Sequence, residues 1–261
     1  MAEAVPVFTT TTPRVRRIEL DQPWSWLAAG WRDLCRAPRV SLAYGVLFAL
    51  ASYAVTFGLW WADLVYLILP MVCGFLIIGP LLAVGLYEVS RRLEAGEPVS
   101  LGAAVMAWQR NGGQIALMGI VLLLLLFAWI RLAALVFMLF FGLEPPSFAG
   151  LFAATFLNPD ALPFLIVGTA IGAVLAALAF AISATSIPFL LDRPDSNVFT
   201  AIATSITAVK ENPGPMLFWA VLVVGFAGAG LITLYLGLIV SLPLIGHATW
   251  HAYRDLVEAA A

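Results

Sequence analysis

The sequence predicts an all-α protein, a polytopic transmembrane helical bundle with six spans, and three observations support this. The 261 residues are 62% hydrophobic and only 11% charged, with a mean hydropathy of +1.00, whereas soluble domains carry about 25% charged residues. Several apolar stretches reach the about 20 residues that a helix needs to cross a bilayer. One pattern of apolar residues also occurs three times along the chain.

The predicted organisation is a disordered cytoplasmic tail over residues 1–20 and a single transmembrane domain over residues 21–261. Each of three repeated units consists of an interfacial helix and a two-span hairpin. The interfacial helices are expected at about 22–37, 99–111 and 197–211, and the spans at about 40–61, 64–88, 114–138, 162–190, 215–229 and 231–251.

The three interfacial helices are predicted from matching apolar stripes, each followed by a break. Trp24, Leu27, Trp31 and Leu34 precede Pro38 with the same spacing that Phe199, Ile202, Ile206 and Val209 show before Pro213. Leu101, Val105 and Trp108 keep part of this register before an Asn-Gly-Gly break at residues 111–113. The N-caps are expected at Asp21, Ser100 and either Ser196 or Asn197.

The return spans are predicted to kink at a proline near their inner ends, at Pro80, Pro188 and Pro243. The last pair is the most ambiguous, because residues 215–251 could form two short spans or one long broken helix. The cluster of Gly225, Gly228 and Gly230 favours a tight outer turn between two short helices.

The placement of the charges predicts the orientation. With these spans, 12 of the 13 Lys and Arg residues fall on one side, so the positive-inside rule places both termini in the cytoplasm. Arg131 is the exception, near the outer boundary. We expect it to be a partner or anion contact, or to pair with Glu144 or Asp160.

The chain's two histidines, His247 and His251, are four residues apart and therefore share one face of the last helix. Such a pair can be half of a metal or haem site, but no further ligand spacing accompanies it, so we predict no metal and no cofactor. The framework from Pro243 to Arg254 repeats that of Pro80 to Arg91. The structural interpretation is thus an interfacial cap whose imidazoles pair with lipid phosphates or backbone carbonyls.

The inner ends of the helices carry arginines that we expect to contact lipid phosphates. They are Arg36, Arg39, Arg91, Arg92 and Arg254. Glu88 is expected to form ion pairs with Arg91 and Arg92 at the next helical turn.

The closing segment, Gly-His-Ala-Thr-Trp-His-Ala-Tyr-Arg-Asp-Leu at residues 246–256, resembles a family of bacterial six-span membrane proteins catalogued as a domain of unknown function. Residues 194–216 and 15–24 also match. The resemblance implies a multi-pass protein of the bacterial inner membrane and implies no activity.

The functional prediction is a non-enzymatic accessory, assembly or interaction subunit of a membrane complex. The sequence shows no P-loop, GxSxG, HExxH or Cys pair. The predicted partners are the phospholipid bilayer and other inner-membrane subunits of the respiratory type, not nucleic acid. Two alternatives stay open: a transporter or channel for a lipid-like or weakly polar solute, and a haem- or metal-binding protein that uses His247 and His251.

Overall fold

The computed structural model describes residues 13–142, 158 and 161–258, and the regular elements within these ranges are helices. They are α1 (Gln22–Arg36), α2 (Pro38–Trp61), η1 (Val65–Leu67), α3 (Ile68–Leu82), α4 (Val84–Ala95), α5 (Leu101–Val105), η2 (Ala107–Asn111), α6 (Gly112–Phe141), α8 (Leu162–Ser183), α9 (Ser186–Asp192), α10 (Val198–Glu211), α11 (Pro213–Ile232) and α12 (Leu238–Leu256). The all-α class is therefore confirmed.

Five helical segments among the described residues are long and apolar enough to cross a membrane. They are Pro38–Trp61, Pro70–Ala95, Ala107–Phe141, Leu162–Asp192 and Pro213–Ile232. Helix α12, which we predicted as the sixth span, is not among them, because its second half carries histidine, arginine and aspartate.

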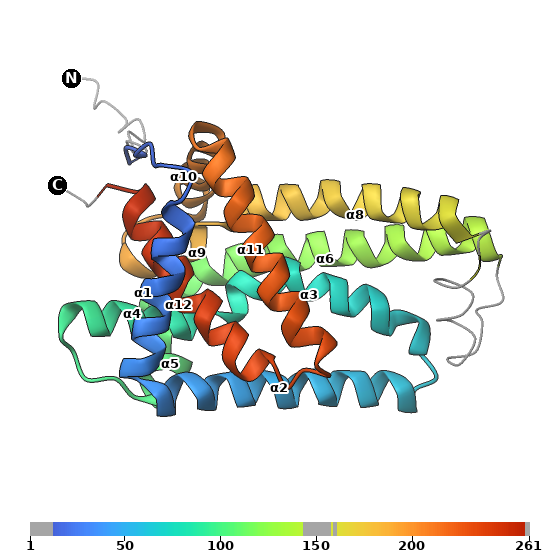
Figure 1. Cartoon of the computed structure of the whole chain (residues 1–261), viewed down its shortest axis with the longest axis horizontal. Coiled ribbons are helices and arrows are strands. Elements are labelled where there is room, and N and C mark those ends of the chain that lie inside the picture. Colours follow the sequence, from blue (N-terminus) through green and yellow to red (C-terminus); the bar gives the residue numbers. More distant parts are fainter. Residues whose placement is uncertain (1–12, 143–157, 159–160, 259–261) are drawn as a thin grey trace, which may run out of the picture.

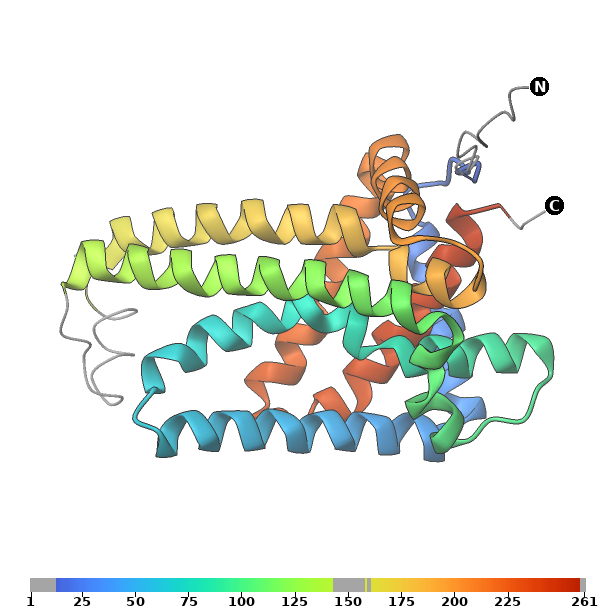
Figure 2. The same cartoon turned by 180° about the vertical axis from the view of Figure 1, so that it is seen from behind.

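The long helices share one direction, and shorter helices cross them at one end. Helices α2, α6 and α8 run along the long axis of the molecule, whereas α1 runs across that axis (Figure 1). The view from behind shows the same arrangement (Figure 2). We call the end that carries α1, α4, α9 and α10 the polar end.

Three helix junctions have nearly the same backbone conformation. Ala37 lies between α1 and α2 with φ −126° and ψ 50°, and Asn212 lies between α10 and α11 with φ −127° and ψ 54°. Asn111, between η2 and α6, has φ −145° and ψ 57°. Proline follows the first two, and a residue before proline is disfavoured in the helical region. Ser100 and Asn197 cap their helices as predicted, whereas the Asp21 side chain makes no capping bond.

The turn between α11 and α12 lies at residues 233–237, where Leu234 and Tyr235 have positive φ. The predicted turn at Gly225, Gly228 and Gly230 is therefore wrong, because all three lie inside α11. A Cβ on Gly230 would lie 2.6 Å from both Leu238 Cδ2 and Ser241 Oγ, so this glycine permits α11 and α12 to approach closely.

Side chains from α2 hold the tip of this hairpin. The Tyr53 hydroxyl donates to the carbonyl of Leu234, and Thr56 Oγ1 lies 2.8 Å from the hydroxyl of Tyr235. Tyr53 precedes Trp61, the last residue of α2, by eight residues, or about 12 Å of helix. The tip therefore stops short of the far end of α2.

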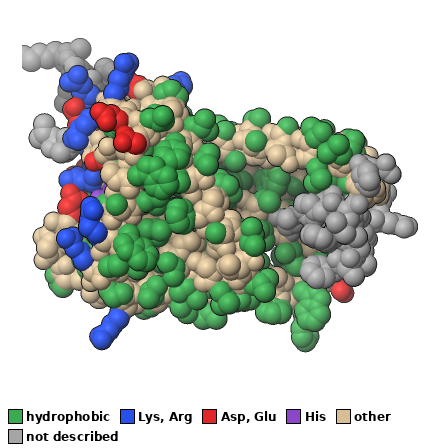
Figure 3. Space-filling view, viewed as in Figure 1, with side chains coloured by type: hydrophobic (Ala, Val, Ile, Leu, Met, Phe, Trp, Pro, Cys, Tyr) green, Lys and Arg blue, Asp and Glu red, His purple; other side chains and the backbone are tan. Residues whose placement is uncertain are grey.

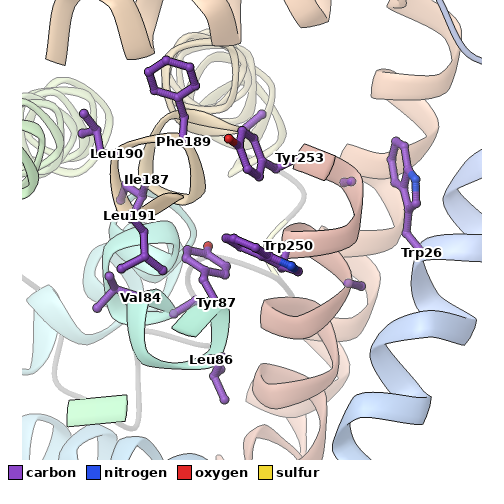
Figure 4. Close-up of a cluster of buried hydrophobic side chains, with 14 of the residues drawn as sticks. Trp26, Val84, Leu86, Tyr87, Ile187, Phe189, Leu190, Leu191, Trp250 and Tyr253 are labelled. Atoms are coloured by element: carbon purple, nitrogen blue, oxygen red, sulfur yellow. The ribbon is translucent and has the colours of Figure 1, made fainter. Parts of the chain in front are cut away.

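At the polar end, α4, α9 and α12 pack against one another. Tyr87, Leu191 and Trp250 meet there, and each is at most 1% exposed (Figure 4). We call this cluster the three-helix core; its members are Leu86, Tyr87, Ile187, Phe189, Leu190, Leu191, Trp250 and Tyr253.

The long apolar helices are packed much more sparsely. In the most apolar 18 residues of the α6 segment, only 17% are buried inside the molecule, and in those of the α8 segment only 11% are. Leu124 and Phe127 on α6 and Val174 on α8 are 60–70% exposed. In a multi-pass membrane protein these surfaces face lipid or other membrane proteins.

Residues 13–20 are not disordered, which corrects part of the predicted tail. Val15 forms an antiparallel bridge with Val257, and the Arg16 amide donates to the carbonyl of Leu256 at 2.8 Å. The Ile18 amide donates to Asn212 Oδ1 at 2.9 Å. The prediction for residues 1–12 lies outside the described residues.

Candidate functional site

Charged side chains gather at the polar end, and hydrophobic side chains are spread over the rest of the described surface in Figure 3. The candidate site must therefore be sought where α1, α2, α4 and α12 meet. Two buried charged residues lie at this end, Asp33 on α1 and Glu88 on α4, each with at most 4% of its surface exposed.

His247 occupies the centre of a buried polar chain. Its Nε2 lies 2.9 Å from Ser41 Oγ on α2, and its Nδ1 lies 2.8 Å from Ser90 Oγ on α4. His247, Ser41 and Ser90 have no exposed surface. Both imidazole nitrogens are thus used by hydroxyl groups of two other helices.

Asp33 continues this chain toward His251. Asp33 Oδ2 lies 2.7 Å from His251 Nε2, and Ser90 also makes a side-chain hydrogen bond to Asp33. Since a carboxylate only accepts, the Ser90 hydroxyl donates to Asp33 and accepts from His247 Nδ1–H. His247 Nε2 then accepts from the Ser41 hydroxyl. We call these five residues, Asp33, Ser41, Ser90, His247 and His251, the histidine network.

The carboxylate of Asp33 is stabilised in its ionised form. Burial alone would raise the pKa of Asp33, but the hydrogen bonds from His251 and Ser90 outweigh it and lower the pKa below its usual value. The folded protein therefore favours a charged carboxylate at this position.

The close crossing of α1 and α12 brings the network together. A Cβ on Gly30 would lie 2.7 Å from the Ala248 amide nitrogen, which is backbone and cannot move aside. Because Asp33 follows Gly30 by three residues and His251 follows Ala248 by three, both side chains emerge one turn from the crossing point.

The network joins helices, and its chemistry is limited by burial. A hydroxyl, an imidazole and a carboxylate in series resemble the arrangement that activates a nucleophile, but no surface of Ser41 or His247 is open to a substrate. The described residues contain no group of three His, Cys, Asp or Glu side chains suited to a metal ion. The imidazoles pair with Ser41, Ser90 and Asp33 rather than with lipid phosphates, and His247 also bonds to the backbone of Leu86, in agreement with the predicted backbone carbonyls.

A second cluster surrounds Glu88, as the spacing predicts. Arg91 Nε and Arg92 Nε lie 2.8 Å and 2.6 Å from the two carboxylate oxygens of Glu88, and Arg110 Nε lies 3.8 Å from it. Glu97 adds a second carboxylate at 2.9 Å from Arg91. Two of the five arginines predicted to contact lipid phosphates, Arg91 and Arg92, are thus already engaged by carboxylates.

A third cluster ties α12 to α4 and α9. Arg254 pairs with Glu94 at 3.0 Å and with Asp192 at 3.4 Å. Trp250 Nε1 donates to Glu94 at 3.0 Å, and the Tyr253 hydroxyl donates to Asp192 at 2.7 Å. Trp250 and Tyr253 are each 1% exposed, so they belong to the core rather than to a membrane interface.

The other predicted site residues are exposed, and of them Arg36 alone reaches a member of these clusters. Arg36 is 65% exposed at its side chain and lies 4.0 Å from Asp33. Arg39 is exposed at the start of α2. Arg131 is exposed on α6, and its predicted partners Glu144 and Asp160 lie outside the described residues.

Asp33, Ser41 and Ser90 were not predicted from the sequence. One signal was available for Asp33, because it lies on the same helical face as Trp26 and Gly30, inside the apolar arc of α1. The serines carried no such signal. They are 206 and 157 residues from His247 in the chain, so only the fold brings them to it.

Comparison with known proteins identifies a membrane protein family without an assigned function. Residues 68–192, a little under half of the chain, match the family described as "Predicted integral membrane protein (DUF2189)". This match confirms the predicted resemblance to a family of unknown function. No curated protein and no solved structure matches the chain.

Proposed function

We propose that this multi-pass integral membrane protein, similar to the DUF2189 proteins, is a non-enzymatic accessory, assembly or interaction subunit of a complex in the bacterial inner membrane. The observation that carries the proposal is a contrast in how side chains are used. The groups able to do chemistry at the polar end are bonded to one another, in the histidine network and around Glu88. The long apolar helices leave most of their surface available to lipid and to other membrane helices.

The proposed topology has six spans in three repeated units, with both termini in the cytoplasm. The matching conformations of Ala37, Asn111 and Asn212 support the repeat. So do two similar contacts: Asn111 Nδ2 donates to the carbonyl of Ser196 before α10, and Asn212 Nδ2 donates to the carbonyl of Arg16 before α1, each at 3.0 Å. Each asparagine thereby holds the segment that leads into the interfacial helix of the next unit.

In this topology α11 and α12 form the third hairpin, which is shorter than the first. The five-span alternative would place the C-terminal segment and Arg254 on the opposite side from Arg14 and Arg16. Two features support an even number of membrane spans. Helix α12 packs against α1 and α11, and Glu258 bonds back to Arg14 through its backbone amide at 3.1 Å.

The transport alternative is less well supported by the polar residues that could line a path. Ser183 donates to the carbonyl of Ala179 in its own helix, and Thr233 donates to Ala229 and Gly230. Thr185 Oγ1 and Ser241 Oγ are buried without a hydrogen-bond partner. Such hydroxyls more often serve helix packing than a solute.

The decisive experiment is purification of the native chain from its own membrane in a mild detergent, followed by identification of the proteins that co-purify. We expect a stable larger complex. A chain that purifies alone and conducts a solute in liposomes would instead establish the transport alternative.

The topology is tested separately, with reporter fusions that are active on one side of the membrane only. Fusions after residue 97 and after residue 258 are expected to report the cytoplasmic side, and a fusion at residue 142 the opposite side. A fusion after residue 258 that reports the outer side would exclude six spans.

A further inference from the structure

Helix α1 has three different faces, and only one of them is buried. At 100° per residue, Trp26, Gly30, Asp33 and Leu34 lie on the face that packs against α12 and the network, and all are buried. Trp24, Ala28, Trp31 and Cys35 form a second face, and Ser25, Arg32 and Arg36 form a third; the residues of both are exposed.

The second face is placed to meet the edge of the bilayer. The rings of Trp24 and Phe218 on α11 are 5.5 Å apart in an edge-on contact, so this face turns toward the apolar part of α11. Trp31 lies two turns further along it and is 51% exposed. Because α1 runs across the long helices (Figure 1), the indole side chains lie along the membrane surface, which is the depth that tryptophan prefers.

The third face carries positive charge that the described residues do not neutralise. Arg32 and Arg39 have no ion pair within the described part of the chain, and Arg36 only approaches Asp33, at 4.0 Å. That carboxylate is already bonded to His251 and Ser90. By contrast, Arg91, Arg92 and Arg254 each have a carboxylate within 3.0 Å. Guanidinium groups without a close carboxylate therefore lie at the corner between α1 and α2.

We propose that Arg32, Arg36 and Arg39, together with Trp31, form a binding site for the headgroup of an anionic phospholipid. A guanidinium group donates two parallel hydrogen bonds to a phosphate, and three such groups, with an exposed indole on the adjacent face of α1, favour a phosphodiester whose acyl chains enter the bilayer. Helix α2 begins at Pro38, so its positive N-terminal dipole adds to the attraction at this corner. This inference rests on the proposed placement of α1 in the membrane interface.

The test uses native mass spectrometry of the full chain in detergent with equal amounts of phosphatidylglycerol and phosphatidylcholine of identical acyl chains. We expect the wild-type chain to retain phosphatidylglycerol preferentially. In the variant R32Q/R36Q/R39Q, this preference should fall by about fivefold per arginine and by about a hundredfold in total.

The matched control is R14Q/R16Q/R17Q, which removes the same charge from the exposed arginines of the N-terminal segment at the same end of the molecule. We expect it to keep the preference for phosphatidylglycerol. Equal losses in the two variants, or no loss in either, would overturn the proposal. Both variants should elute as the wild type does in size-exclusion chromatography, since all six side chains are exposed.

A competition arm separates a lipid headgroup from free phosphate. Inorganic phosphate is added in excess over phosphatidylglycerol, and the bound lipid is measured again. The lipid should stay bound, because its acyl chains contribute to the affinity; displacement by phosphate would show a site for the free anion instead. These outcomes do not depend on which proteins co-purify, so the lipid site and the proposed interaction role can fail separately.

Discussion

The polar end and the long apolar helices are held together in different ways. At the polar end, α4, α9 and α12 share a core in which Tyr87, Leu191 and Trp250 are at most 1% exposed, and buried ion pairs and hydrogen bonds join the helices around it. Along the apolar part, only 11% of the α8 window is buried. In this part α3 packs against α6 and α6 against α8, but α2 makes few contacts with α3.

The difference indicates where the fold is specified. In lipid, apolar side chains gain little by leaving the surrounding hydrocarbon, so helix association there depends on close packing and polar contacts. The polar end has both, whereas in the apolar part α3, α6 and α8 pack together but few polar contacts join the helices. We therefore expect the polar end to determine the stability of the isolated chain, and the apolar part to be completed by lipid or partner helices.

The largest effect is expected from Trp250→Ala in the three-helix core. Truncation of a fully buried Trp costs about 3–5 kcal/mol, and here it also leaves Glu94 without the indole donor. The matched control is Trp61→Ala at the far end of α2, where the side chain is 88% exposed. Unfolding by titration with denaturing detergent measures both; equal losses would remove the distinction between the two regions.

The next largest effect is expected from one additional methyl group. Gly30→Ala places a Cβ against the backbone of α12 and should destabilise the protein by about 2–3 kcal/mol. Gly168→Ala on α8, where nothing lies within 4 Å of the new Cβ, should stabilise it by about 0.5–1 kcal/mol. Thermal unfolding in detergent shows whether each substitution raises or lowers the stability. A lower stability of Gly168→Ala would show that α8 is more tightly packed than its exposure indicates.

A smaller effect is expected from the pH dependence of Asp33. Its pKa is lower in the folded chain than in the unfolded one, so its contribution to stability is present above the unfolded pKa of about 4 and is lost as the pH falls through the folded pKa. The melting temperature of the wild type should therefore fall on acidification. Asp33→Asn should be less stable by about 1–3 kcal/mol at pH 7 and should lose this part of the slope. If the melting temperature of Asp33→Asn depends on pH as that of the wild type does, other carboxylates cause the pH dependence.

The smallest effect is expected from Arg131→Gln on α6. The side chain is exposed and belongs to none of the three clusters of the polar end, and such substitutions usually change stability by less than about 0.5 kcal/mol. Measured in the purified chain, its melting temperature should match the wild type. A smaller amount of co-purified partner in the same variant would support the predicted role of Arg131 in partner contact.

The sequence predicted the helices of this fold better than it predicted their contacts. The breaks at Pro38, Asn111 and Pro213 are local signals, because a proline after a polar or small residue, or an Asn-Gly pair, often marks a helix boundary. The turn at residues 233–237 was missed because its residues have positive φ without glycine at Leu234 or Tyr235, and α2 supplies the bonds that hold it. The burial of Trp250 could not be predicted either, because an indole near a membrane surface is equally typical of an interfacial belt.

The two ends of the described chain lie side by side, and this has a consequence for how the fold can be connected. Asn111 holds the segment between α9 and α10, which the chain joins to a helix at each end. Asn212 holds residues 16–18, which are joined by the chain to α1 but contact the end of α12 only through hydrogen bonds, such as that from Arg16 to Leu256. Linking Glu258 to Pro13 by a short flexible loop, and opening the chain between α4 and α5, would give a circular permutant with the same neighbours around each helix. If three like units make this fold, the permutant should still insert into the membrane and bury Trp250.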